Sequence, residues 1–287
     1  MSESHFITPR LVLKKVLAKS LQQGNGAVLR VIPGEWESLD PFVTLFHFSV
    51  TAPEGFPDHP HRGFESVTYI LQGALRYQDF AGHKSTVTTG DWVTAGRGIV
   101  HSEMPAEEGT HTGIQLWINL PSKLKMMEPR YKEVKRKEIP IVKKEGVEMR
   151  VLAGKAGAVE SPYYSQTPVM MLDVTMKPTS EMHHTIPHCN CFVYVIEGEG
   201  VFGSVDCAPI EEHHVAVLGD GEGVSVWNKS KEKELRYLVI GGDAVKESVT
   251  VGATFVMNTQ TQIQDTLEDF RHFKNGFELA KFWKSHY

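Results

Sequence analysis

The sequence predicts an all-β protein built from two barrel-like domains, with short helices only near its C-terminal end. Two observations carry this prediction. Short segments rich in Val, Ile, Thr and aromatic residues recur along most of the chain, and Gly, Pro and Asp bound them, as expected for strands joined by turns. The two halves of the chain also resemble each other, which indicates a duplicated β-fold. The 287 residues suffice for two domains that each bury a core.

Four segments show the strand pattern most clearly. Each combines β-branched or aromatic residues and ends near turn-forming residues. They are Ser66–Leu71, Ile114–Leu120, Met170–Met176 and Phe192–Ile196. Many such strands at short spacing are typical of β-sandwiches and barrels.

Helical periodicity is confined to the C-terminal end. Ile263, Leu267 and Phe270 stand at i, i+4 and i+7, after a helix-start signal at Asn258-Thr259. Asn275-Gly276 interrupts the pattern. A second short helix is expected from Phe277 to Trp283.

The internal repeat sets the expected domain boundary. His59–Gly73 aligns with His184–Gly198, because both run from a histidine through a turn into a strand that ends before a glycine. We therefore expect domains at residues 1–134 and 135–287. The polar, lysine-rich segment 121–146 lies at this boundary. Its charge pattern is typical of a solvated connection, with a binding patch for an acidic partner as the alternative.

Composition narrows the classes of function. The net charge of −5 and the pI of about 6.3 give no general attraction to nucleic acid or to anionic membranes. No apolar run reaches the length of a membrane span, and the N-terminus lacks the pattern of a signal peptide. Three cysteines do not make a disulfide framework and favour a reducing compartment. We expect an intracellular protein that binds neither nucleic acid directly nor membranes.

Two pairs of metal-donor residues stand in the first half. They are His59-Pro-His61 and His101-Ser-Glu103. In a strand, residues i and i+2 face the same side, so each pair converges. Either pair alone is more typical of ordinary surface or core residues. Together, both beside glycine turns, they favour one metal site with ligands His59, His61, His101 and Glu103. Three imidazoles and a carboxylate suit iron, manganese, nickel, cobalt or copper better than magnesium or calcium.

The second half contains many potential zinc ligands, but their spacing argues against zinc. The Cys-x-Cys pair lacks the usual second cysteine pair. In the repeat alignment, Ile186 replaces His61, and Val224–Val226 replaces the segment with His101 and Glu103. We expect this half to lack metal ligands. The residues set aside are His183, His184, His188, Cys189, Cys191, His213 and His214.

Several segments resemble the pirin family of two-cupin proteins, and plant pirin-like proteins most. They are FPDHPHRGFESVTYILQG (56–73), TAGRGIVHSEMP (94–105), GIQLWINLP (113–121), LDPF (39–42), FVMNT (255–259) and FKNGFELAKFWKS (273–285). The resemblance spans nearly the whole chain. It implies two tandem jelly-roll cupin barrels, and one iron ion (Fe2+ or Fe3+) per chain on His59, His61, His101 and Glu103. The C-terminal cupin is expected to hold no metal.

The chain departs from the family pattern at two places. Two residues are missing near Asp91-Trp92, and the region Val31–Glu37 is shorter than usual. The first deletion shortens the strand that leads to His101. Because an even number of residues is missing, the side chains keep their alternation.

The resemblance implies two functions from different classes. One is a flavonol (quercetin) 2,3-dioxygenase that uses O2, with Glu103 as metal ligand and catalytic proton acceptor. Phe56, Trp92 and Trp117 are expected to form an apolar wall, with Arg62 and Arg97 controlling access of anions. The alternative is a non-enzymatic, metal- or redox-dependent nuclear cofactor that binds transcription or signalling proteins, in the cytoplasm and nucleus. A structural two-cupin protein without metal is the third possibility.

Overall fold

The fold is known from a computed structural model, which describes residues 6–23, 26–32, 39–187 and 190–286. Strands make up most of the described chain, which confirms the predicted all-β class. Within those residues, no helix combines the length and the apolar character needed to cross a membrane.

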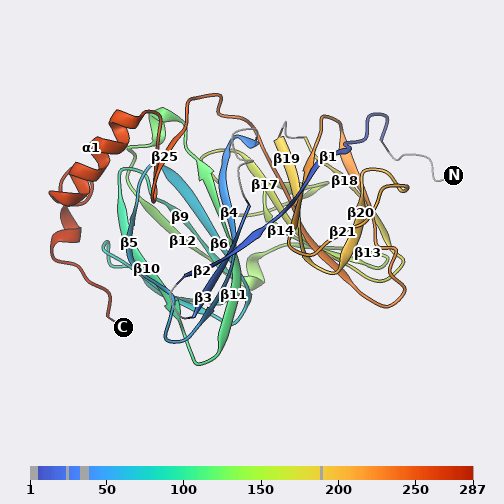
Figure 1. The fold of residues 1–287 in the computed structure, drawn as a ribbon, viewed down its shortest axis with the longest axis horizontal. Coiled ribbons are helices and arrows are strands. Elements are labelled where there is room, and N and C mark those ends of the chain that lie inside the picture. Colours follow the sequence, from blue (N-terminus) through green and yellow to red (C-terminus); the bar gives the residue numbers. More distant parts are fainter. Residues whose placement is uncertain (1–5, 24–25, 33–38, 188–189, 287) are drawn as a thin grey trace. The chain divides into compact units, whose positions relative to one another are not determined.

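The chain forms two compact units that do not follow a single cut in the sequence. The N-terminal barrel comprises residues 20–31, 41–136 and 245–287, and the C-terminal barrel comprises 1–19, 32–40 and 137–244. Each barrel thus takes a terminal segment from the opposite end of the chain. In Figure 1 the red helix α1 (Gln260–Arg271) lies beside green strands from the first half of the sequence. The domain boundary that the sequence predicts between residues 134 and 135 stays a prediction.

The N-terminal barrel consists of two antiparallel sheets. The order of the seven-stranded sheet is β12 (Arg130–Val134), β9 (Gly90–Thr94), β6 (Phe64–Gln72), β11 (Thr110–Asn119), β4 (Phe42–Thr51), β3 (Ala27–Val31) and β2 (Lys19–Gln23). The order of the four-stranded sheet is β5 (Phe56–His61), β10 (Ile99–Pro105), β7 (Leu75–Asp79) and β8 (Lys84–Val87).

The C-terminal barrel repeats this plan strand for strand. Its seven-stranded sheet has the order β1 (Val12–Leu17), β22 (His214–Leu218), β19 (Asn190–Glu197), β24 (Leu235–Gly242), β17 (Val169–Met176), β14 (Val147–Ala153) and β13 (Ile141–Lys144). Its four-stranded sheet has the order β18 (Glu181–Thr185), β23 (Gly223–Trp227), β20 (Glu199–Phe202) and β21 (Ile210–Glu211). The weak sequence repeat therefore corresponds to a duplicated barrel. A separate two-stranded ribbon pairs β15 (Lys155–Ala156) with β16 (Val159–Glu160).

The predicted C-terminal helix is confirmed as α1. The Thr259 side chain accepts a hydrogen bond from the backbone of Gln262, and the Gln262 side chain accepts one in return, which is a capping box. Before it, β25 (Thr250–Gly252) and β26 (Phe255–Met257) form a hairpin. The second expected helix is a short 3-10 turn, η4 (Glu278–Lys281).

The lysine-rich segment 121–146 is not a plain solvated connection. It contains η2 (Ser122–Leu124), η3 (Arg136–Glu138) and the edge strands β12 and β13. Edge strands commonly carry charged side chains because these discourage pairing with other chains. The run of lysine and arginine residues is therefore explained by the edge strands as well as by exposure to solvent.

Candidate metal centre

The pairing of β5 with β10 brings three histidines together. In this antiparallel pair His101 stands opposite His59, and Ile99 stands opposite His61. The ring centroids are 4.6 Å apart for His59 and His61, 4.5 Å for His59 and His101, and 4.8 Å for His61 and His101. Their potential ligand atoms all lie within 4.8 Å of one another. Within the described part of the chain, no other residues form such a group.

Backbone carbonyls fix the orientation of two of these rings. His59 Nδ1 lies 2.8 Å from Pro57 O, and His61 Nδ1 lies 3.3 Å from Thr254 O. A carbonyl only accepts, so in both rings Nδ1–H donates and Nε2 keeps its lone pair. His61 Nε2 is buried without a hydrogen-bond partner. In metal sites, a hydrogen bond from the ring nitrogen that does not bind the metal usually orients the imidazole.

The spacing of the imidazoles fits a bound metal ion. His59 Nε2 and His101 Nε2 are 3.0 Å apart. Imidazole nitrogens bind a first-row metal ion at about 2.0–2.1 Å, so two of them at a right angle stand about 3.0 Å apart. The donor set and this separation therefore suit one ion shared by the rings.

Burial keeps the three imidazoles neutral. It lowers the pKa of His59, and it lowers the pKa of His61 and His101 well below the ordinary value of 6.5. For His61 and His101, a charge on His59 would depress the pKa further. Neutral imidazole is the form that binds metal, because a protonated ring has no free lone pair.

Glu103 lines the same cavity but is held by hydrogen bonds. Thr68 Oγ1 donates to Oε1 at 3.0 Å, and Gln115 Nε2 donates to Oε2 at 3.1 Å. Burial raises the pKa of Glu103, whereas these two hydrogen bonds lower it. Glu103 is outside the close group of three histidines. β10 pairs with β7 in unbroken register through both residues, so His101 and Glu103 point to the same face of β10. The register shift between β10 and β5 places its extra residue on β5, between Phe56 and His59.

Gln115 is a site residue that the sequence did not reveal. Trp117 Nε1 donates to Gln115 Oε1 at 2.8 Å, which leaves the amide nitrogen to face Glu103. The only available signal was a polar residue in the middle of a buried strand, flanked by Ile114 and Leu116. Many polar residues in strands satisfy that description.

A cavity of about 470 Å³ opens at the histidines. Most of its wall is apolar, and its polar lining residues are Asp58, His59, His61, Glu103, Gln115 and Thr254. The apolar lining includes Leu29, Phe46, Phe48, Phe56, Pro57 and Trp117. Two of the three expected wall residues are thus present, whereas Trp92 does not line the cavity. Phe46 and Trp117 meet edge to face, with ring centroids 5.5 Å apart.

Comparisons with known proteins identify the family. One family model, Pirin, matches residues 26–118, and a second, the Pirin C-terminal cupin domain, matches residues 171–276. A pirin-like protein from tomato (Solanum lycopersicum) is 54% identical over 98% of this chain and 98% of its own length. The chain belongs to the pirin family. Human pirin is 43% identical, over 96% of this chain and 97% of its own length.

Among solved structures, a quercetin 2,3-dioxygenase from Acinetobacter baumannii has the same fold as this pirin. Its TM-score is 0.85 at 27% identity, covering 94% of this chain and 99% of that chain. The predicted two-cupin architecture is therefore confirmed. The C-terminal family model extends to residue 276, so it includes the segment from 245 onward that packs in the N-terminal barrel.

The two departures from the pirin pattern have different outcomes. β9, which contains Asp91 and Trp92, pairs with β6 and β12 in unbroken register. The deletion there leaves His101 beside His59. Residues 33–37 of the other shortened region lie outside the described residues.

Arg62 does not control access to the cavity as the sequence suggested. It is 2% exposed, and its guanidinium donates a hydrogen bond to Asp269 Oδ2 at 2.8 Å. Arg97 is partly exposed and pairs with Glu128 at 3.1 Å. His111 is also structural, because its Nδ1 accepts from Ala74 N at 2.9 Å and its Nε2 lies 2.9 Å from Glu107 O.

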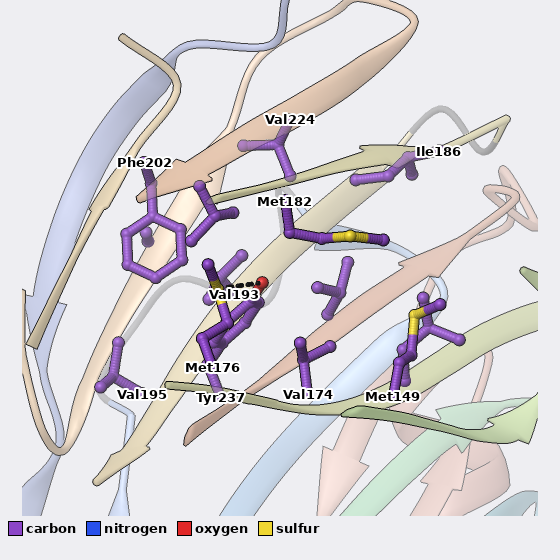
Figure 2. Close-up of a cluster of buried hydrophobic side chains, with 14 of the residues drawn as sticks. Met149, Val174, Met176, Met182, Ile186, Val193, Val195, Phe202, Val224 and Tyr237 are labelled. Atoms are coloured by element: carbon purple, nitrogen blue, oxygen red, sulfur yellow. Dashed lines mark hydrogen bonds between the residues drawn. The ribbon is translucent and has the colours of Figure 1, made fainter. Parts of the chain in front are cut away.

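In the C-terminal barrel His184 stands at the position of His59, whereas the other positions of the predicted ligand set are apolar. His184 pairs with Val224 as His59 pairs with His101, so Val224 and Val226 occupy the positions of His101 and Glu103. These valines and Ile186 are buried in the barrel core. Figure 2 shows Ile186, Met182 and Val224 within this cluster of side chains. Cys191 is buried, Cys207 is exposed, and neither forms a disulfide.

Two polar side chains of that barrel, His184 and Tyr237, form a hydrogen bond with each other. His184 Nε2 lies 2.7 Å from Tyr237 Oη, which donates to Met176 Sδ at 3.4 Å, the dashed line in Figure 2. Burial lowers the pKa of His184 to about 3. His183 Nδ1 lies 2.9 Å from Ser225 Oγ. His188 and Cys189, two of the residues weighed as zinc ligands, lie outside the described residues.

Proposed function

We propose that this pirin binds one iron ion per chain on His59, His61, His101 and Glu103 and oxidises a flavonol with O2, as a quercetin 2,3-dioxygenase. One observation carries the proposal: three imidazoles converge beside a mostly apolar cavity, and His59, His61 and Glu103 of the proposed ligand set line that cavity. The similarity to a bacterial quercetin 2,3-dioxygenase supports the choice of substrate class.

The mixed nitrogen and oxygen donor set supports a transition metal. Imidazoles with one carboxylate suit iron, manganese, cobalt, nickel or copper. When bound, such an ion acts as a Lewis acid that lowers the pKa of a coordinated hydroxyl group. The choice of iron among these metals is part of the proposal and rests on the family resemblance.

The cavity wall suits a flat aromatic substrate. Phe46, Phe48 and Trp117 offer aromatic faces and edges, which bind ring systems and exclude water. Gln115 contributes a polar group on the same wall. These residues would hold the rings of a flavonol while its hydroxyl groups face the histidines.

Glu103 is suited to accept the proton of the flavonol hydroxyl. Burial raises its pKa, and a base with a raised pKa accepts a proton more readily. Each of its oxygens already accepts one hydrogen bond, and a carboxylate oxygen has a second acceptor position. Thr68 and Gln115 would hold the carboxyl group in place as the proton arrives.

A regulatory role remains the second candidate. In that proposal the metal, or its oxidation state, sets a surface that transcription or signalling proteins recognise in the cytoplasm and nucleus. The net charge of −5 favours protein partners over direct contact with nucleic acid. No turnover is needed in this case.

Anaerobic titration with quercetin separates the two candidates. Iron-loaded full-length protein should give a bathochromic shift that saturates near one flavonol per chain. Exposure to 18O2 should then consume oxygen and place both labelled atoms in the product. The matched control is His272→Ala, an exposed histidine directly after α1, which should behave as wild type. Absence of both the shift and oxygen uptake would favour the regulatory candidate.

A further inference from the structure

A buried arginine follows directly after a metal-site histidine. Arg62 is 2% exposed and donates four hydrogen bonds. The acceptors are Arg97 O at 2.7 Å, Thr266 Oγ1 at 3.2 Å, Asp269 Oδ2 at 2.8 Å and Asn275 O at 2.7 Å. Three of the four acceptors belong to the C-terminal segment. The Arg62 side chain therefore ties the end of β5 to α1 and the turn that follows it.

The backbone of the C-terminal segment also contacts the residues that directly follow His61. Val256 N donates to Arg62 O at 3.0 Å. A Cβ atom on Gly63 would stand 1.9 Å from Val256 O, so only glycine allows this approach. The buried Lys125 Nζ donates to Gly63 O at 2.9 Å and to Val256 O at 3.1 Å. The backbone hydrogen bond from Val256 to Arg62 and the buried ammonium group of Lys125 thus hold β26 against residues 62–63.

This segment also reaches the metal centre itself. Thr254 O accepts from His61 Nδ1 at 3.3 Å, and Ala253 and Thr254 line the cavity. The contact orients the His61 ring so that Nε2 faces His59 and His101. Residues more than 190 positions further along the chain therefore help to shape the site.

The contact between Arg62 and Asp269 is a buried ion pair that favours full docking of the segment. The two side chains are 2% and 10% exposed, and the Phe277 ring covers the guanidinium at 4.6 Å. Removing one partner of a buried ion pair leaves an uncompensated charge, which strongly favours release of the segment. Partial docking would leave the same charge unpaired.

We propose that residues 250–277 are a positioning element of the metal centre, and that Arg62 is the positioning residue that couples their docking to metal binding. The inference rests on the proposed metal site but not on the flavonol chemistry. Coupling is reciprocal, so metal binding should stabilise the docked segment as much as docking favours the metal.

The first test measures this reciprocity in the wild-type protein. Hydrogen exchange of residues 250–277 is compared without metal and with Fe2+ alone under anaerobic conditions, with β24 of the C-terminal barrel as internal reference. The segment should exchange more slowly with the ion, by at least about tenfold in rate, while β24 changes little. Equal exchange of the segment with and without a bound ion would overturn the coupling.

The second test weakens the docking without touching a histidine. Asp269→Asn keeps the shape of the side chain and removes its charge, and Thr266→Val removes one hydrogen bond of Arg62. Loss of partners that orient metal ligands typically weakens metal binding about 10- to 100-fold. We expect such a loss for Asp269→Asn and a smaller one for Thr266→Val, by competition with a chelator. Arg271→Ala, which removes an exposed ion pair on the same helix, is the matched control.

The outcomes separate this inference from the proposed function. If the wild type binds no metal ion, the proposed metal site fails and the coupling fails with it. If Asp269→Asn exposes the segment to exchange but binds Fe2+ as tightly as wild type, only the coupling is wrong. Should Asp269→Asn fail to fold, Thr266→Val and the wild-type exchange measurement still decide the question.

Discussion

At the scale of single residues, the site depends on how each imidazole is turned. Pro57 O and Thr254 O fix Nδ1 of His59 and His61, so both Nε2 atoms are available to one ion. The strand spacing of His-x-His and His-x-Glu predicted that His59, His61 and His101 lie close together, as they do, whereas Glu103 lies outside this close group. The sequence did not predict Thr254 or Gln115, because their contacts depend on tertiary packing between distant strands.

Replacing His61 should empty the metal site. His61→Ala removes a ligand whose Nε2 has no other partner, so we expect most of the metal to be lost during purification. Elemental analysis measures the metal-to-protein ratio in the variant and in wild type. His272→Ala should retain full metal content, and full retention in His61→Ala would contradict the assigned ligands.

His184 should make stability depend on pH. Its folded-state pKa of about 3 lies below the ordinary value of 6.5. Above pH 6.5 it is neutral in both states and contributes no pH dependence. As the pH falls from 6.5 toward 3, the unfolded chain binds a proton that the folded protein does not, so the free energy of unfolding decreases. The slope for one such group is about 1.4 kcal/mol per pH unit.

His184→Gln should remove this contribution, since glutamine does not titrate. Urea unfolding of wild type and variant at several pH values between 4 and 6 gives the two slopes. The variant should show a shallower dependence by about 1.4 kcal/mol per pH unit. Identical slopes would mean that His184 is protonated in the folded barrel.

At the scale of elements, the residue pattern predicted the strands better than it predicted the segments that connect them. The segment Ser66–Leu71 lies within β6, and the segment Phe192–Ile196 lies within β19. Both segments could be predicted because β-branched and aromatic residues are typical of buried strands. The many lysines of segment 121–146 predict a solvated connection, but the segment contains two edge strands. Edge strands bury little, so their composition resembles that of loops.

The crossing of β26 over Gly63 gives an element-scale prediction. Gly63→Ala places a Cβ at a positive φ of 85° and 1.9 Å from Val256 O, so β26 must move. We expect a loss of more than about 3 kcal/mol in the free energy of unfolding. Gly82→Ala is the matched control, because Gly82 has a φ of 96° but open space around it. Its loss should be about 1 kcal/mol, and equal losses in both variants would contradict the crossing.

At the scale of the whole molecule, the chain ends are exchanged between the barrels. Residues 245–287 complete the N-terminal barrel, where Phe255, Met257, Ile263 and Phe277 are buried in its core. Burying a large apolar side chain contributes about 1.5–3 kcal/mol. Four of them contribute about 6–12 kcal/mol, comparable to the whole stability of a typical domain. The repeat in the sequence could not reveal this exchange, because both terminal segments lie outside the aligned region.

Fragments of the chain test the exchange. A fragment of residues 1–134 should show no cooperative unfolding and no metal binding. A permuted chain, in which residues 245–287 are linked before residues 20–136, should show both. Thermal unfolding followed by circular dichroism, together with metal titration, makes the comparison. Cooperative unfolding and metal binding by fragment 1–134 would show that the C-terminal segment is dispensable.

Anomalous diffraction at the iron absorption edge tests the metal centre most directly. Crystals of protein purified without added metal should show one anomalous peak in the N-terminal barrel. It should lie about 2.1 Å from the Nε2 atoms of His59, His61 and His101, the usual distance for imidazole ligands. No peak at these histidines, or a peak only elsewhere in the molecule, would contradict an iron centre at this site.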